Sequence, residues 1–183
     1  MTRSNWLGLI GLCLAALASS GCDRAAPASG PQDPSAQELL GRIASLEQLV
    51  PDQAHIMADV GYHFGNLWFA GRAENWPLAD FYLSETRSHL RWAVRRIPVR
   101  KDSQGREVHL GNILEAFENS QLAQLKGTID RKDKLGFEAM YRESLTMCYS
   151  CHKASDKPYL RPQIPDEPET RVINFDPKAD WPR

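Results

Sequence analysis

The spacing of apolar residues between positions 35 and 153 constrains the fold of this 183-residue chain more than any other feature. Large apolar side chains recur there every three or four positions, which is the period of a helix with one buried face. No run of alternating β-branched residues is long enough to indicate a strand. We therefore predict an all-α fold, in which a short helix precedes a four-helix bundle and the whole helical domain occupies residues 35–153.

Proline, glycine and capping residues mark the ends of the expected helices. Ser35 with Glu38 three positions later forms a capping box, and Pro51 ends the short helix that begins there. The predicted helices span residues 35–50, 52–72, 75–97, 110–131 and 134–153. The segment 99–108 is predicted to be a polar loop.

The last segment, residues 154–183, has a different composition. It holds half of the chain's 12 prolines, and it also carries large apolar residues such as Tyr159, Ile164 and Phe175. A disordered tail rarely has so many large apolar groups. We predict an extended Pro-rich tail packed on the bundle.

The charge balance narrows the class of partner. With 22 Lys and Arg against 23 Asp and Glu, the net charge is −1, whereas nucleic-acid-binding domains carry a basic excess. Arg87, Arg91 and Arg95 nevertheless form a basic stripe at helical spacing. The stripe is interpreted either as a solvated face or as a docking surface for an acidic redox partner or anionic lipid.

The first 21 residues have the features of an export signal. Arg3 precedes an apolar run over residues 6–18, which is too short to span a bilayer permanently. Cys22 follows small residues and resembles the lipidated cysteine of bacterial lipoproteins, although Ser19 stands where a Leu is usual. Asp23 resembles an inner-membrane retention signal. We predict a signal peptide (1–21), lipidation of Cys22, a flexible tether (22–34) and a periplasmic, inner-membrane-anchored protein. Cleavage without lipidation is the alternative.

The most informative motif is Cys148-Tyr149-Ser150-Cys151-His152. The pattern C-x-x-C-H is typical of covalent haem c attachment, in which two thiols bind the haem vinyl groups and the histidine binds the iron. A zinc site would need more ligands, a redox dithiol would need a βαβ context, and a disulfide here would close only a tiny loop. We predict one haem c on Cys148 and Cys151, with His152 as the proximal ligand.

A C-x-x-C-H motif on the last helix of an exported bundle resembles the cytochrome c′ and cytochrome c-556 group. The resemblance covers residues 52–155, and the stretches 67–71 and 75–79 are similar to segments of small bacterial monohaem cytochromes. It implies a four-helix bundle with haem c on the last helix. The long tail and the lipoprotein-like start depart from the cytochrome c′ pattern.

The distal iron ligand is the part of the site that the sequence leaves open. His63 is preferred narrowly, because a histidine on an apolar helix face needs a partner. Met57 is the alternative, since the c-556 group carries a methionine ligand early in its first long helix. His89 ranks third. His55 and His109 are expected in solvent, and Met140 and Met147 beside the haem.

These features predict a monohaem c-type cytochrome that transfers single electrons between periplasmic or membrane redox proteins. The alternative is a cytochrome c′-like protein that binds nitric oxide or carbon monoxide at an open distal site. No set of distal catalytic residues indicates an enzyme such as a peroxidase. A homodimer is compatible with the sequence.

Overall fold

A computed structural model describes residues 34–180, and most of them are helical. The order of elements is α1 (Ala36–Leu49), α2 (Gln53–Arg72), α3 (Trp76–Arg96), β1 (Val99–Lys101), β2 (Glu107–His109), α4 (Leu110–Asn119), α5 (Gln121–Asp130) and α6 (Lys134–Ala154). The predicted signal peptide, Cys22 and nearly all of the predicted tether lie outside the described residues. Within the described range, no helix is both long and apolar enough to cross a bilayer.

The chain divides into two units, Met1–Arg42 and Ile43–Arg183, and the boundary falls inside α1. The capping box predicted for this helix is present, because the Glu38 carboxylate accepts from the backbone N–H of Ser35 at 2.8 Å, and the Ser35 hydroxyl accepts from the N–H of Glu38 at 3.3 Å. No residue of α1 is buried.

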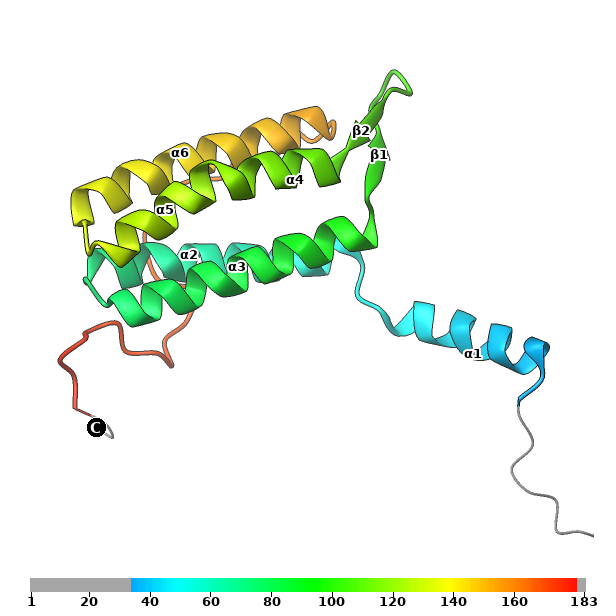
Figure 1. The fold of residues 1–183 in the computed structure, drawn as a ribbon, viewed down its shortest axis with the longest axis horizontal. Helices are drawn as coiled ribbons and strands as arrows, with labels where there is room; N and C mark the ends of the chain where they lie inside the picture. The colour runs from blue at the N-terminus through cyan, green and yellow to red at the C-terminus, as the bar shows by residue number, and fades with distance from the viewer. Residues whose placement is uncertain (1–33, 181–183) are drawn as a thin grey trace, which may run out of the picture. The chain divides into compact units, whose positions relative to one another are not determined.

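Residues 43–183 hold the remaining elements. Figure 1 shows α2 and α3 side by side as one layer, with α4, α5 and α6 forming the other. Side chains start three of these helices at the predicted positions, since Asp52, Asn75 and Asp133 each accept a hydrogen bond from the N–H three residues later. Each bond satisfies a donor that the first helical turn leaves free.

The predicted helix over residues 110–131 is interrupted, so α4 and α5 are separate helices. Ser120 leaves the helical conformation, with φ −119° and ψ −95°. Its hydroxyl donates to the carbonyl of Ala116, the acceptor that a continuous helix would offer to the Ser120 N–H. A serine that bonds back in this way competes with the backbone ladder and bends helices.

The predicted loop over residues 99–108 is a short antiparallel hairpin, which pairs Val99 with His109 and Lys101 with Glu107. The Asp102 carboxylate holds the turn by accepting from the N–H groups of Gln104 and Arg106, both at 2.9 Å. Gly105 closes it at φ +76°, a conformation that glycine adopts without steric cost.

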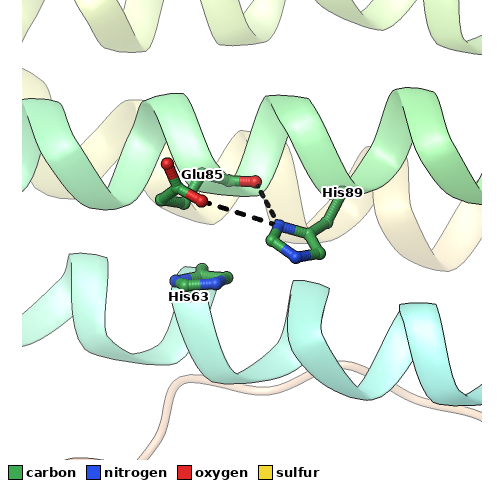
Figure 2. A group of neighbouring side chains, drawn as sticks. All are labelled: His63, Glu85 and His89. Atoms are coloured by element: carbon green, nitrogen blue, oxygen red, sulfur yellow. Dashed lines mark hydrogen bonds and ion pairs between the residues drawn. The ribbon is translucent and has the colours of Figure 1, made fainter.

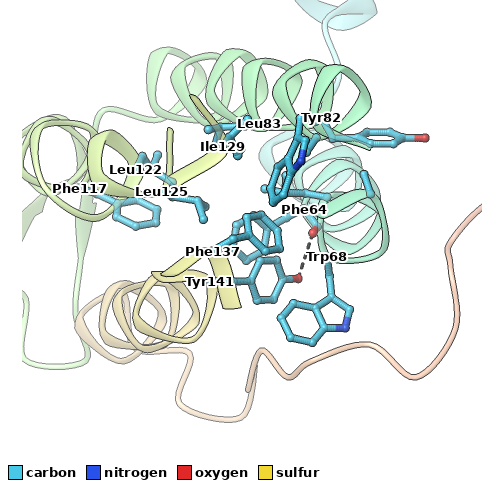
Figure 3. Close-up of a cluster of buried hydrophobic side chains, with 14 residues drawn as sticks. Phe64, Trp68, Tyr82, Leu83, Phe117, Leu122, Leu125, Ile129, Phe137 and Tyr141 are labelled. Carbon is cyan, nitrogen blue, oxygen red and sulfur yellow. Dashed lines mark hydrogen bonds between the residues drawn. The ribbon is translucent and has the colours of Figure 1, made fainter. Parts of the chain in front are cut away.

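Aromatic side chains form the centre of the core between the two layers (Figure 3). Phe64 of α2 stacks on Tyr141 of α6 at a centroid distance of 4.4 Å, and the Tyr141 hydroxyl donates to the Phe64 carbonyl at 2.9 Å. Trp68 lies 4.9 Å from Tyr141. Aliphatic side chains of α3 and α5 complete the cluster, including Leu83, Leu122, Leu125 and Ile129.

The segment after α6 returns along α2 and α3. The N–H of Glu169 donates to the Asn66 side-chain carbonyl at 3.1 Å, and the Asn75 side-chain amide donates to the carbonyl of Phe175 at 3.2 Å. The Phe175 ring lies against the core cluster. These contacts secure the segment to the bundle at two places.

Candidate functional site

Cys148, Cys151 and His152 lie in the last two turns of α6, which ends at Ala154. Residues three and four positions apart share a helix face, so all three side chains project from the same side of α6. Both cysteines are free thiols and half-buried. The local sequence therefore brings two thiols and one imidazole together without help from another element.

The surroundings of the two thiols keep them protonated. Cys148 packs against the core cluster, and burial raises the pKa of its thiol to about 12, with a further contribution from Cys151. Burial also raises the pKa of Cys151, against an opposing hydrogen bond from Ser155. A redox-active cysteine instead has a lowered pKa.

The His152 ring is oriented by the chain that follows α6. Its Nδ1 lies 2.9 Å from the carbonyl oxygen of Leu160. Because a carbonyl oxygen can only accept, Nδ1 carries a hydrogen, and in the neutral ring the lone pair is therefore on Nε2. A backbone carbonyl bonded to the far nitrogen is the usual support of a metal-binding histidine. His152 thus has the tautomer that an axial ligand requires.

Met57 lies on the face of α2 that is directed at α6. The contacts of Phe64 and Trp68 with Tyr141, and of Trp68 with Phe137, show that α2 and α6 are antiparallel. Met57 precedes Phe64 by about two helical turns on the same face. Cys148 follows Tyr141 by the same interval, so Met57 and Cys148 lie at the same level of the bundle. Met57 itself is half-buried.

His63 lies on a different side of α2. Its ring is 4.8 Å from the His89 ring and 6.1 Å from that of Tyr82, both on α3. Figure 2 shows His63 and His89 in the seam between the two helices, next to Glu85. Burial lowers the pKa of His63, and the charge of His89 lowers it further. The structure therefore brings His63 and His89, the first- and third-ranked distal candidates, together in the seam between α2 and α3.

His55 and His109 are exposed, as the sequence predicts, whereas the predicted place of Met140 and Met147 beside a haem stays a prediction. His55 is paired with Asp52 at 2.8 Å and His109 with Glu107 at 3.5 Å, and both are exposed. Met140 and Met147 of α6 pack beside the core cluster.

Glu85 and Asp59 are members of the histidine cluster that sequence reasoning missed. The His89 Nε2 lies 3.9 Å from an Asp59 oxygen, and its Nδ1 lies 4.0 Å from a Glu85 oxygen. The available signal was a repeated spacing, since each helix carries a carboxylate four residues before a histidine. That spacing places both groups on one face of a helix.

Two surface hollows, of about 330 and 460 Å³, lie elsewhere on the bundle. The first is lined by Ser120 and Met140 among others, and the second by Trp68 and Arg142. Neither is lined by the C-x-x-C-H residues.

Comparisons of the chain with models of protein families, with curated proteins and with solved structures found no match.

Proposed function

We propose that this protein is an exported monohaem c-type cytochrome that transfers single electrons between periplasmic redox partners. Haem c would be held by thioether bonds to Cys148 and Cys151, with His152 Nε2 as the proximal iron ligand. One observation carries the proposal: two thiols and an imidazole whose Nδ1 bonds to the Leu160 carbonyl project from one face of the last turns of α6. When bound, the haem supplies a one-electron redox centre.

The packing around α6 supports a planar apolar ligand at this end of the bundle. Figure 1 shows the start of α2, the end of α3 and the start of α4 level with the C-terminal half of α6. Buried apolar residues of these segments do not belong to the aromatic cluster, namely Ile56, Val60, Ala93 and Leu110. A ring attached at Cys148 would give these side chains a common packing partner and would be shielded from water by them.

We assign the distal position to Met57 in place of His63. Met57 lies on the α6-directed face of α2 at the level of Cys148, whereas the ring contacts of His63 are with Tyr62, Tyr82 and His89. A methionine sulfur bound to the iron favours electron transfer, because it fills the coordination position that a gaseous ligand would use.

The remaining parts of the proposal concern location and partners. Export, and lipidation of Cys22 at the inner membrane, rest on the first 23 residues of the sequence. Docking of an acidic redox protein rests on the basic stripe. Arg91 of that stripe already pairs with Glu118 at 2.6 Å, which leaves Arg87 and Arg95 as the residues to test in a docking experiment.

Absorption and EPR spectra of the purified holoprotein test the proposed electron-transfer function. We expect a low-spin ferric haem that, after reduction, does not bind carbon monoxide, together with a reversible one-electron potential. A high-spin haem that binds carbon monoxide would overturn electron transfer in favour of the gas-binding alternative. Mass spectrometry of the mature N-terminus tests lipidation of Cys22.

A further inference from the structure

Two antiparallel helices present a matched set of possible metal ligands away from the C-x-x-C-H motif. On α2, Asp59 precedes His63 by one turn, and on α3, Glu85 precedes His89 by one turn. One ligand atom from each of His63, Glu85 and His89 lies within 4.8 Å of the others, and all three residues are half-buried. Asp59 lies 3.9 Å from His89 and brings a second carboxylate to the same place.

His63 has a buried ring nitrogen without a partner among the described residues, and His89 has a ring nitrogen that could bind an ion. The His63 Nδ1 is buried, and within residues 34–180 it has no hydrogen-bond partner. A buried polar atom without a partner is costly and calls for an explanation. The His89 Nδ1 lies 2.9 Å from the Glu85 carbonyl oxygen, so Nδ1 carries a hydrogen, and in the neutral ring Nε2 has the lone pair that a metal ion would need.

We propose that His63, Glu85 and His89 bind a first-row divalent transition-metal ion such as Zn²⁺, with Asp59 as the fourth ligand. Two imidazoles and two carboxylates are a ligand set that Zn²⁺ accepts in tetrahedral geometry. The Glu85 carbonyl orients the His89 ring in the way that backbone carbonyls orient metal-binding histidines. The proposal does not depend on haem binding, since none of these residues is part of the C-x-x-C-H motif.

Binding an ion would require the ligand atoms to move closer together. Ligand atoms on one tetrahedral Zn²⁺ are about 3.3 Å apart, whereas the atoms in this cluster are spread over as much as 4.8 Å. The Glu85 carboxylate lies 4.0 Å from His89 Nδ1, so its side chain would have to rotate toward Nε2, where an Asp59 oxygen lies at 3.9 Å; both carboxylate side chains are partly exposed. Bound in this way, the ion would link the middle of α2 to the middle of α3.

Calorimetric titration of Zn²⁺ into the metal-free, untagged holoprotein tests the proposal, with Mg²⁺ as a cation that prefers oxygen ligands. We expect one Zn²⁺ per chain and no comparable binding of Mg²⁺. His63→Gln, His89→Gln and Glu85→Gln should each weaken binding about tenfold or more. His109→Gln and His55→Gln are matched controls, because each removes a histidine paired with a carboxylate outside the cluster, and they should bind as the unchanged protein does.

Three results would overturn the proposal. They are the absence of stoichiometric Zn²⁺ binding to the unchanged protein, cluster variants that bind as tightly as it does, and control variants that lose binding equally. Far-UV circular dichroism checks that each variant is folded. If one His variant fails to fold, the isosteric Glu85→Gln change decides the question together with the Zn²⁺-dependent rise in Tm, which Glu85→Gln should abolish.

Discussion

At the scale of single residues, the structure shows that Met57 and His63 lie on different faces of α2, which the sequence alone could not show. Met57 and His63 are both half-buried on α2, and both lie beside the apolar stripe of that helix. The contacts of Phe64 with Tyr141 fix which side of α2 faces α6. Once this orientation of α2 is known, Met57 is placed opposite Cys148, and His63 is placed in the seam between α2 and α3.

Replacing Met57 tests this separation. In Met57→Ala, loss of the thioether ligand should turn the ferric haem from low to high spin and allow the reduced protein to bind carbon monoxide. His63→Ala, the matched change in the same helix, should leave both properties unaltered. The opposite pattern, with His63→Ala changing the spin state, would restore His63 as the distal ligand.

The residues of the C-x-x-C-H motif could be predicted from the sequence because they are neighbours in the chain. Cys148, Cys151 and His152 are close together in the chain, so one helix is enough to gather them. The cluster of His63, Glu85 and His89 could not be predicted in this way, because it forms only where two helices pack together. The Leu160 carbonyl that orients His152 has no signature in the sequence, since any residue supplies a backbone carbonyl.

At the scale of the elements, helices whose ends are set by side chains were predicted well. Asp52, Asn75 and Asp133 each start a helix with a local hydrogen bond. The interruption at Ser120 was missed, because a serine inside an apolar pattern usually leaves the helix intact. The hairpin was missed because its strands are only three residues each and too short to show a period.

Gly71 tests the packing of α2 against α6. A Cβ atom at this position would overlap the Phe137 ring, which is fully buried and unable to move aside. Gly71→Ala should therefore lower the free energy of unfolding by about 1–3 kcal/mol in a urea titration followed by tryptophan fluorescence.

Gly61→Ala is the matched control for that prediction. Gly61 also lies inside α2, and a Cβ there would meet nothing within 4 Å. The change should raise the free energy of unfolding by about 0.5–1 kcal/mol, because alanine is the better helix former. Equal effects of the two substitutions would contradict the close approach of α2 to Phe137.

At the scale of the whole molecule, contacts between distant segments determine how the chain closes. Phe175 lies 6.1 Å from the Phe69 ring and 6.2 Å from the Tyr82 ring. The Pro-rich composition of this segment indicated extended chain, and its apolar residues indicated burial. Which residues it would contact depended on the bundle itself and could not be predicted from the segment alone.

Phe175→Ala should lower the free energy of unfolding by about 1–2 kcal/mol, less than the 3–5 kcal/mol of a fully buried phenylalanine, because the ring is only half-buried. Val172→Ala, at a side chain that is 90% exposed, should have no measurable effect. If thermal or urea unfolding cannot distinguish the two variants, the segment after α6 does not stabilise the bundle.

Covalent haem attachment is the central claim, and the intact mass of the exported protein tests it most directly. Produced in a bacterium that attaches haem c, the mature chain should exceed the mass of its polypeptide, counted with any lipid on Cys22, by one haem, and should give the pyridine haemochrome spectrum of a haem c. Replacing both Cys148 and Cys151 by Ser should abolish both signals, while Cys22→Ser should leave them intact in any mature chain obtained. A folded, exported chain that carries no added mass and two free thiols would contradict the account.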